Sequence, residues 1–130
     1  MAKRVRPSEL ELQILAILWD RGPATIRAIR DVLPDGKTRA YTTVLTLVQI
    51  MEKKGLVGHE AQGQTHVYHP LVLRRQVLRP MMRDLLRNVF LGDPAQAVQC
   101  LLDGASLDEE ELSQIQELVQ NASRRPPKDG

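Results

Sequence analysis

The chain has 130 residues, of which 42% are apolar and only 3% aromatic, and it carries a formal charge of +2. This length fits one small domain, or a small domain with an appendage, and the apolar content argues against disorder. With a single cysteine, Cys100, an intrachain disulfide is excluded, and no Cys/His cluster has zinc-site spacing. We find neither the apolar run of a signal peptide nor a stretch that could cross a bilayer, so we expect a soluble cytoplasmic protein without membrane insertion.

The charges are unevenly distributed along the chain. Residues 1–75 carry 12 Lys and Arg against 7 Asp and Glu, whereas residues 76–130 carry 6 against 9. A basic first part favours a polyanionic partner such as nucleic acid, and ordinary surface variation is the alternative explanation.

Two helices are predicted at the start of the chain. Ser8 and Glu11 have the spacing of a capping box, so a first helix should begin there, and Gly22-Pro23 should end it. Thr25 can cap a second, shorter helix that ends at Pro34.

A third helix is predicted within "RAYTTVLTLVQIMEKKGLV", with Gly55 just beyond its end. One face is apolar and consists of Val44, Leu47, Val48 and Met51. The opposite face is polar and consists of Thr42, Thr46, Gln49 and Lys53, with Thr43 beside it. Thr42 or Thr43 could merely satisfy first-turn N–H groups, but Thr46 lies one turn inside the helix, where no cap is needed.

A short hairpin is predicted between Leu56 and His69, because β formers surround Gln62-Gly63 there. A two-residue turn at Gln62-Gly63 would pair Gly58 with Val67 and His59 with His66.

The hairpin histidines and Cys100 are the candidates for metal binding or catalysis. His59 and His66 could share a metal, but His66 and His69 point to opposite faces of a strand, so a third ligand is not evident. We therefore favour ordinary hairpin histidines, with metal binding left open, and we expect Cys100 to be a buried small hydrophobe. No catalytic residue, metal site or cofactor is predicted, and the protein should not be an enzyme.

Three further helical segments are predicted after the hairpin. Pro80 falls inside "LVLRRQVLRPMMRDLLRNVF" and should kink that helix or break it in two. A short helix should run from Pro94 to Gly104, and the last should start near Ser106 or Asp108.

The whole pattern predicts a mainly α fold with a small β-hairpin. Residues 1–70 should form a winged helix-turn-helix domain, residues 71–122 a helical dimerisation region and residues 123–130 a disordered tail. The apolar residues of the second half cannot form an adequate core by themselves, which favours burial against a second copy. The interface candidates are Leu78, Met82, Leu85, Val89, Val98, Leu101, Leu102, Leu112, Ile115 and Val119. The alternative is that these helices fold back on the winged domain.

A helix with a polar face that follows a shorter helix is the arrangement of a recognition helix in the major groove of DNA. Threonine suits base contacts because its hydroxyl donates and accepts while its methyl can touch thymine, which favours Thr42, Thr43 and Thr46. Contacts with the DNA backbone are predicted for Arg27, Lys37, Arg39, Gln49, Lys53 and Lys54.

Three segments, "ELELQILAILWDRGPATIRAIRDVLP", "AYTTVLTLVQIMEKKGLV" and "HVYHPLV", resemble the penicillinase repressor (BlaI/MecI/CopY) family of bacterial transcriptional regulators. The resemblance extends from about Glu9 to Val119. It implies a homodimeric repressor on a palindromic double-stranded DNA operator, with base reading by the third helix and backbone contacts from the wing at Gln62, Gly63 and Gln64. It also implies a membrane sensor metallopeptidase as a candidate partner.

Three departures from the family pattern limit what the resemblance implies for this chain. The wing tip "AQGQT" has no arginine, and the C-terminal CxC pair of copper-responsive members is absent. Where antibiotic-responsive members are cleaved at Asn-Phe, this chain has Cys100-Leu101 as the matching candidate cleavage site. The inducing signal, the operator and the regulated genes are therefore left open, and a winged-helix module for protein contacts is the alternative function.

Overall fold

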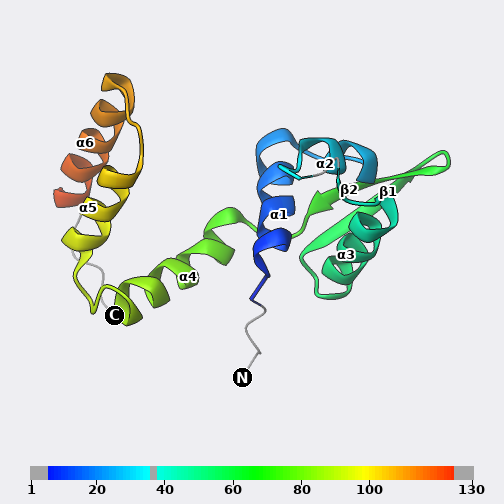
Figure 1. The fold of residues 1–130 in the computed structure, drawn as a ribbon, viewed down its shortest axis with the longest axis horizontal. Helices are drawn as coiled ribbons and strands as arrows, with labels where there is room; N and C mark the ends of the chain where they lie inside the picture. Colours follow the sequence, from blue (N-terminus) through cyan, green and yellow to red (C-terminus); the bar gives the residue numbers. More distant parts are fainter. Residues whose placement is uncertain (1–5, 36–37, 125–130) are drawn as a thin grey trace. The chain divides into compact units, whose positions relative to one another are not determined.

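The computed structural model describes residues 6–35 and 38–124, and the chain divides into two compact units, Met1–Met82 and Arg83–Gly130. The first unit contains α1 (Glu9–Arg21), α2 (Ile26–Val32), α3 (Tyr41–Lys53), β1 (Val57–Gln62) and β2 (Thr65–Pro70). Helix α4 (Arg74–Asn88) begins in the first unit and ends in the second, which also holds α5 (Pro94–Gly104) and α6 (Glu109–Ser123) (Figure 1). Within the described residues, six helices and one hairpin confirm the mainly helical prediction.

Local capping fixes the starts of α1 and α2, as the sequence predicted. The Glu11 N–H donates to Ser8 Oγ at 3.2 Å, and the Ser8 N–H donates to Glu11 Oε1 at 2.8 Å. The Ala28 N–H donates to Thr25 Oγ1 at 3.1 Å. Each bond satisfies a first-turn N–H that has no partner inside its helix.

The threonines at the start of α3 do not cap it. Its N-cap residue is Ala40, and no side chain accepts a capping hydrogen bond there. At the other end Gly55 has φ +81°, a left-handed conformation, and the Leu56 N–H donates to the Met51 carbonyl at 3.0 Å. Capping is thereby removed as the explanation for Thr42 and Thr43.

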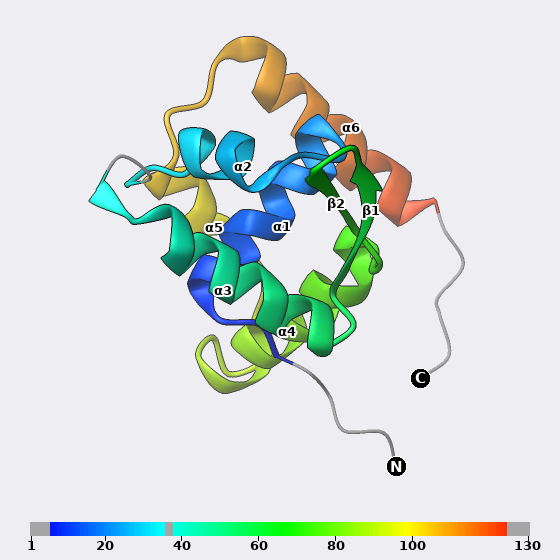
Figure 2. The same cartoon turned by 90° about the vertical axis from the view of Figure 1, so that its right-hand side faces the viewer.

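The core of the first unit lies between its three helices and the hairpin. Figure 2 shows α1 at the centre of this unit with α2, α3 and the hairpin around it. An isolated bridge joins the hairpin to the segment before α2, since the Ala24 N–H donates to the Tyr68 carbonyl at 2.9 Å and the Tyr68 N–H donates to the Ala24 carbonyl at 2.8 Å. The buried apolar residues are Ile14, Leu15, Ile17, Leu18, Ile26, Ile29, Leu33, Val44, Val48, Met51, Leu56, Val57 and Tyr68.

The predicted register of the hairpin was wrong. The turn is Gly63-Gln64, so the observed pairs include Gln62 with Thr65, His59 with Tyr68 and Gly58 with His69. The reason is backbone geometry: Gly63 has φ +62°, which glycine adopts freely at the first turn position. A turn at Gln62-Gly63 would have placed glutamine at that position instead.

Helix α4 is continuous from Arg74 to Asn88 with Pro80 inside it, so of the two predicted outcomes, a kink or a break into two helices, the break does not occur. The neighbouring leucine, arginine and methionine residues are strong helix formers, which favours continuation on both sides of the proline. The predicted bounds of α5 are confirmed, and a capping box between Asp108 and Glu111 starts α6. Helix α6 continues to Ser123, so the predicted disordered tail begins too early, and residues 125–130 lie outside the described part.

Candidate nucleic-acid interface

Helix α3 separates its apolar and polar side chains as predicted. Val44, Val48 and Met51 are at most 1% exposed in the core. Because the helix has about 3.6 residues per turn, the opposite side faces solvent. All five polar residues predicted there are exposed: Thr42, Thr43, Thr46, Gln49 and Lys53.

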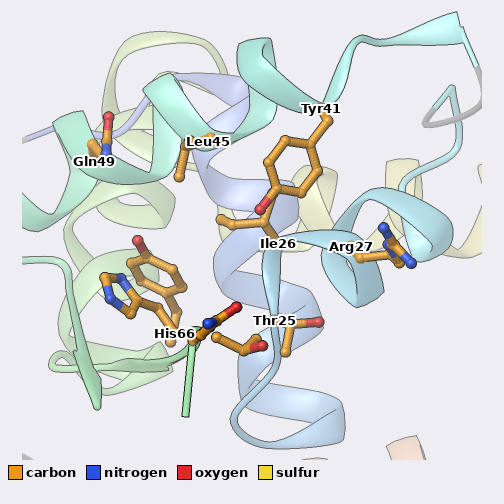
Figure 3. Close-up of a pocket in the computed structure, with 10 residues that line it drawn as sticks. Thr25, Ile26, Arg27, Tyr41, Leu45, Gln49 and His66 are labelled. Carbon is orange, nitrogen blue, oxygen red and sulfur yellow. The ribbon is translucent and has the colours of Figure 1, made fainter. Parts of the chain in front are cut away.

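An open cavity of about 620 Å³ lies on one side of α3, next to the start of α2 and the hairpin. It brings together three of the predicted backbone contacts, Arg27, Gln49 and Gln64. In Figure 3, Tyr41 of α3 points across this cavity toward Ile26 of α2. We call this cavity the wing-side groove, and its other lining residues are Thr25, Leu45, Thr65, His66 and Tyr68.

Sequence reasoning missed Tyr41 and His66 as residues of this groove. Tyr41 lies on the same flank of α3 as Leu45, so helical spacing could have identified it. His66 was missed because the predicted hairpin register was wrong. The groove combines three elements, and no local sequence pattern describes it.

A second, smaller cavity of about 440 Å³ lies on the opposite side of α3, against the start of α1. Its lining residues are Leu10, Thr42, Thr43, Thr46, Leu47 and Ile50. The three threonines predicted to contact bases therefore share one surface, where hydroxyl groups lie beside apolar side chains. That combination can accept both the polar edge and the methyl group of a base.

Arg39, a predicted backbone contact, is engaged within the loop before α3. Its Nε and Nη2 atoms donate to the two carboxylate oxygens of Asp35 at 2.9 and 2.7 Å, while its carbonyl accepts from Arg30 Nε at 2.6 Å. The Arg39 hydrogen bond holds the pKa of the Asp35 carboxyl below its usual value. Arg39 thus stabilises the turn between α2 and α3.

Lys54, another predicted backbone contact, pairs with a buried carboxylate. Its Nζ lies 3.1 Å from Glu11 Oε1 and 3.0 Å from Oε2. Burial raises the pKa of Glu11, but the Ser8 N–H and the Lys54 ammonium outweigh burial and leave this pKa below its usual value. Unlike Lys54, the predicted backbone contacts Arg27 and Lys53 form no ion pair within residues 6–35 and 38–124. Lys37, also predicted to contact the backbone, lies outside the described residues.

The wing tip is exposed at Gln62, Gly63 and Gln64, and it offers amide side chains and backbone groups rather than cations. Behind it, the rings of His59 and His66 stack with centroids 4.4 Å apart. Among the described residues, no group of three or more His, Cys, Asp or Glu could hold a metal ion.

His59 pairs with Glu52 of α3, and its ring lies close to that of Tyr68. His59 Nδ1 lies 2.6 Å from Glu52 Oε2, and its ring is 5.4 Å from that of Tyr68. Burial, followed by the negative charge of Glu52, raises the pKa of the Tyr68 phenol. These interactions hold the hairpin against α3.

No residue of α4, α5 or α6 is buried in the single chain. Of the predicted interface residues, Leu78, Leu102 and Ile115 are half-buried, and the others are exposed by 42–65%. Cys100 is exposed too, so the expectation that it is buried was wrong for the single chain. The neighbouring side chains on α5 cover too little of the Cys100 surface to bury it.

Three packed helices and an antiparallel hairpin, with a polar face of the third helix open to solvent, define a winged helix-turn-helix module. A family model described as "Penicillinase repressor" matches residues 7–121. The chain belongs to the penicillinase repressor family, whose members are transcriptional repressors and not enzymes.

Two relatives identified by sequence agree with this family. The chain is 30% identical over 131 residues to the transcriptional regulator BlaI of Mycobacterium tuberculosis, covering 98% of this chain and 95% of that protein. It is 21% identical over 125 residues to the penicillinase repressor of Bacillus licheniformis, with 96% and 98% covered. The solved CopR repressor matches 55% of this chain and 100% of its own at 25% identity, with a TM-score of 0.43. In the described part, we find no helix that is both long and apolar enough to span a membrane.

Proposed function

We propose that this repressor binds a palindromic DNA operator as a homodimer, with α3 of each copy in the major groove. The observation that carries the proposal is the exposed polar face of α3, whose threonines do not cap the helix. Thr42, Thr43 and Thr46 would contact base edges and thymine methyl groups.

The phosphates beside the major groove would be held from the wing-side groove and the wing. Arg27 and Lys53 have no protein carboxylate as partner in the described residues, so their charges are available for phosphates. The uncharged backbone contacts would come from Gln49, Gln62, Gly63 and Gln64. Because the wing tip lacks a cation, its share of the salt dependence should be small.

Dimerisation through α4, α5 and α6 is supported by the apolar side chains that a single chain leaves exposed. Leu101, Met82 and Val89 are 64%, 62% and 65% exposed, and exposed apolar area of this kind is typical of a surface that another molecule covers. A twofold dimer would present two α3 helices to two half-sites of a palindrome.

Release from the operator would follow from separation of the two copies. Cys100-Leu101 lies in α5 and is exposed, and a membrane sensor metallopeptidase is the partner that would cleave this bond. Cleavage would remove α6 from the rest of the chain and weaken operator binding, because linked sites bind far more tightly than separate ones.

The proposal is tested by titrating the protein with a mixed-sequence DNA duplex and with a duplex selected from a random pool, over a range of salt concentrations. We expect the selected duplex to bind more tightly, and the logarithm of affinity to fall linearly with the logarithm of salt concentration. Failure to bind any duplex at low salt would overturn the proposal and favour a protein-contact module.

A further inference from the structure

Glu11 is the one charged residue buried in the core of the first unit, as far as the described residues show, with 1% of its surface exposed. A buried carboxylate is costly unless each oxygen has a partner. Here Oε1 accepts from the Ser8 N–H at 2.8 Å, and both oxygens accept from Lys54 Nζ. Glu11 therefore joins the start of α1 to a residue 43 positions later in the chain.

Lys54 occupies the junction between the recognition helix and the wing. It is the C-cap residue of α3, and its N–H donates to the Ile50 carbonyl at 3.0 Å. Leu56 and Val57, which begin the wing, are 4% and 0% exposed. A contact that fixes Lys54 thus fixes both the end of α3 and the root of β1.

We propose that the Glu11–Lys54 ion pair sets the pose of the recognition helix and the wing against α1, and that Lys54 is a positioning residue rather than a phosphate contact. The inference rests on the proposed function, because the pose matters through the DNA that α3 reads. A DNA phosphate could draw Lys54 away only by leaving the buried Glu11 carboxylate with the Ser8 N–H alone. Lys53, one residue earlier, has no carboxylate partner among the described residues, although both lysines are exposed.

Neighbouring lysines give a matched pair for the test, which compares Lys54→Met with Lys53→Met. Affinities for the selected and the mixed-sequence duplex are measured over a range of salt, at a temperature where circular dichroism shows every variant folded. Lys53→Met should weaken both duplexes similarly and reduce the salt slope by about 0.9, the value for one phosphate.

Lys54→Met should leave the salt slope unchanged and weaken the selected duplex about tenfold more than the mixed-sequence duplex, since a displaced helix loses base contacts before phosphate contacts. Lys54→Arg, which can retain the ion pair, should restore most of this preference. If Lys54→Met does not fold, Glu11→Gln serves in its place, because glutamine keeps an acceptor for the Ser8 N–H.

Two results would overturn the inference while leaving the proposed function intact. A salt slope reduced in Lys54→Met as in Lys53→Met would make Lys54 a phosphate contact. If the folded Lys54→Met and Glu11→Gln variants keep the wild-type affinity and the wild-type preference for the selected duplex, the ion pair only stabilises the fold. A wild-type protein that binds no duplex would overturn the proposed function itself, and the inference with it.

Discussion

The two units of this chain bury their apolar residues very differently. In the described part of the first, thirteen apolar residues form one core, and several of them, including Leu15 and Val48, are fully inaccessible to solvent. In the second, α5 and α6 contain leucines and valines at helical spacing, yet none of their residues is buried. The same kind of amphipathic helix thus completes a domain in one unit and leaves an apolar face uncovered in the other. This difference separates the part that should read DNA from the part that should bring two copies together.

The largest effect should follow from a charge placed on the uncovered apolar face. Leu85→Asp should give monomers and lower the affinity for the selected duplex by about a hundredfold or more, because the two half-sites are no longer linked. Analytical ultracentrifugation and duplex titration measure the two effects. Gln114→Asp adds the same charge at an exposed polar position of α6 and should leave both unchanged. A Leu85→Asp variant that still sediments as a dimer would contradict the proposed dimerisation through α4, α5 and α6.

The next largest effect should follow from truncating a core side chain in the first unit. Leu15→Ala removes a side chain with 0% exposure and should lower the free energy of unfolding by about 2–5 kcal/mol. In the monomeric Leu85→Asp background, Leu101→Ala should change it by less than about 0.5 kcal/mol, since Leu101 is 64% exposed. Urea unfolding followed by circular dichroism compares them, and equal losses would mean that α5 packs in a core of its own.

A smaller and more specific loss is expected for Thr46→Ala. Removing its hydroxyl and methyl should cost about 1–3 kcal/mol in binding to the selected duplex and leave the mixed-sequence duplex nearly unaffected. Ser113→Ala removes an exposed hydroxyl from α6 and serves as the control. Equal losses on both duplexes would mark Thr46 as a general contact with the backbone.

The smallest effect should be the acid sensitivity contributed by Glu11. Its pKa in the folded protein lies below the usual 4.5, so its contribution to stability is complete above that value and is lost as the pH falls through the lowered pKa. The difference in unfolding free energy between the wild type and Glu11→Gln should be largest near about pH 7 and shrink toward about pH 3. Urea titrations at several pH values measure it, and a difference that grows in acid would reverse the assigned sign.

Features set by neighbouring residues could be predicted from the sequence. The capping box of Ser8 and Glu11, the cap at Thr25 and the stop at Gly55 each depend on a few adjacent residues, and all were confirmed. The hairpin register was wrong because it depends on which residue takes the positive φ at the turn, and here that residue is Gly63.

Features that join distant parts of the chain could not be predicted. The partner of Lys54 is Glu11 in α1, 43 residues earlier in the chain. The wing-side groove depends on how α2, α3 and β2 pack, so the sequence did not show that Tyr41 and His66 line one cavity. Whether Cys100 is exposed likewise depends on which other residues cover α5, and the sequence of α5 alone does not show them.

The central claim is that two copies of α3 read one palindromic site. Hydroxyl-radical footprinting of the wild-type protein on the selected duplex tests this claim most directly. We predict two symmetric protected regions with centres about 10 base pairs, or a small multiple of that distance, apart, one for each recognition helix. A single protected region, or protection without a sequence shared among selected duplexes, would contradict the account.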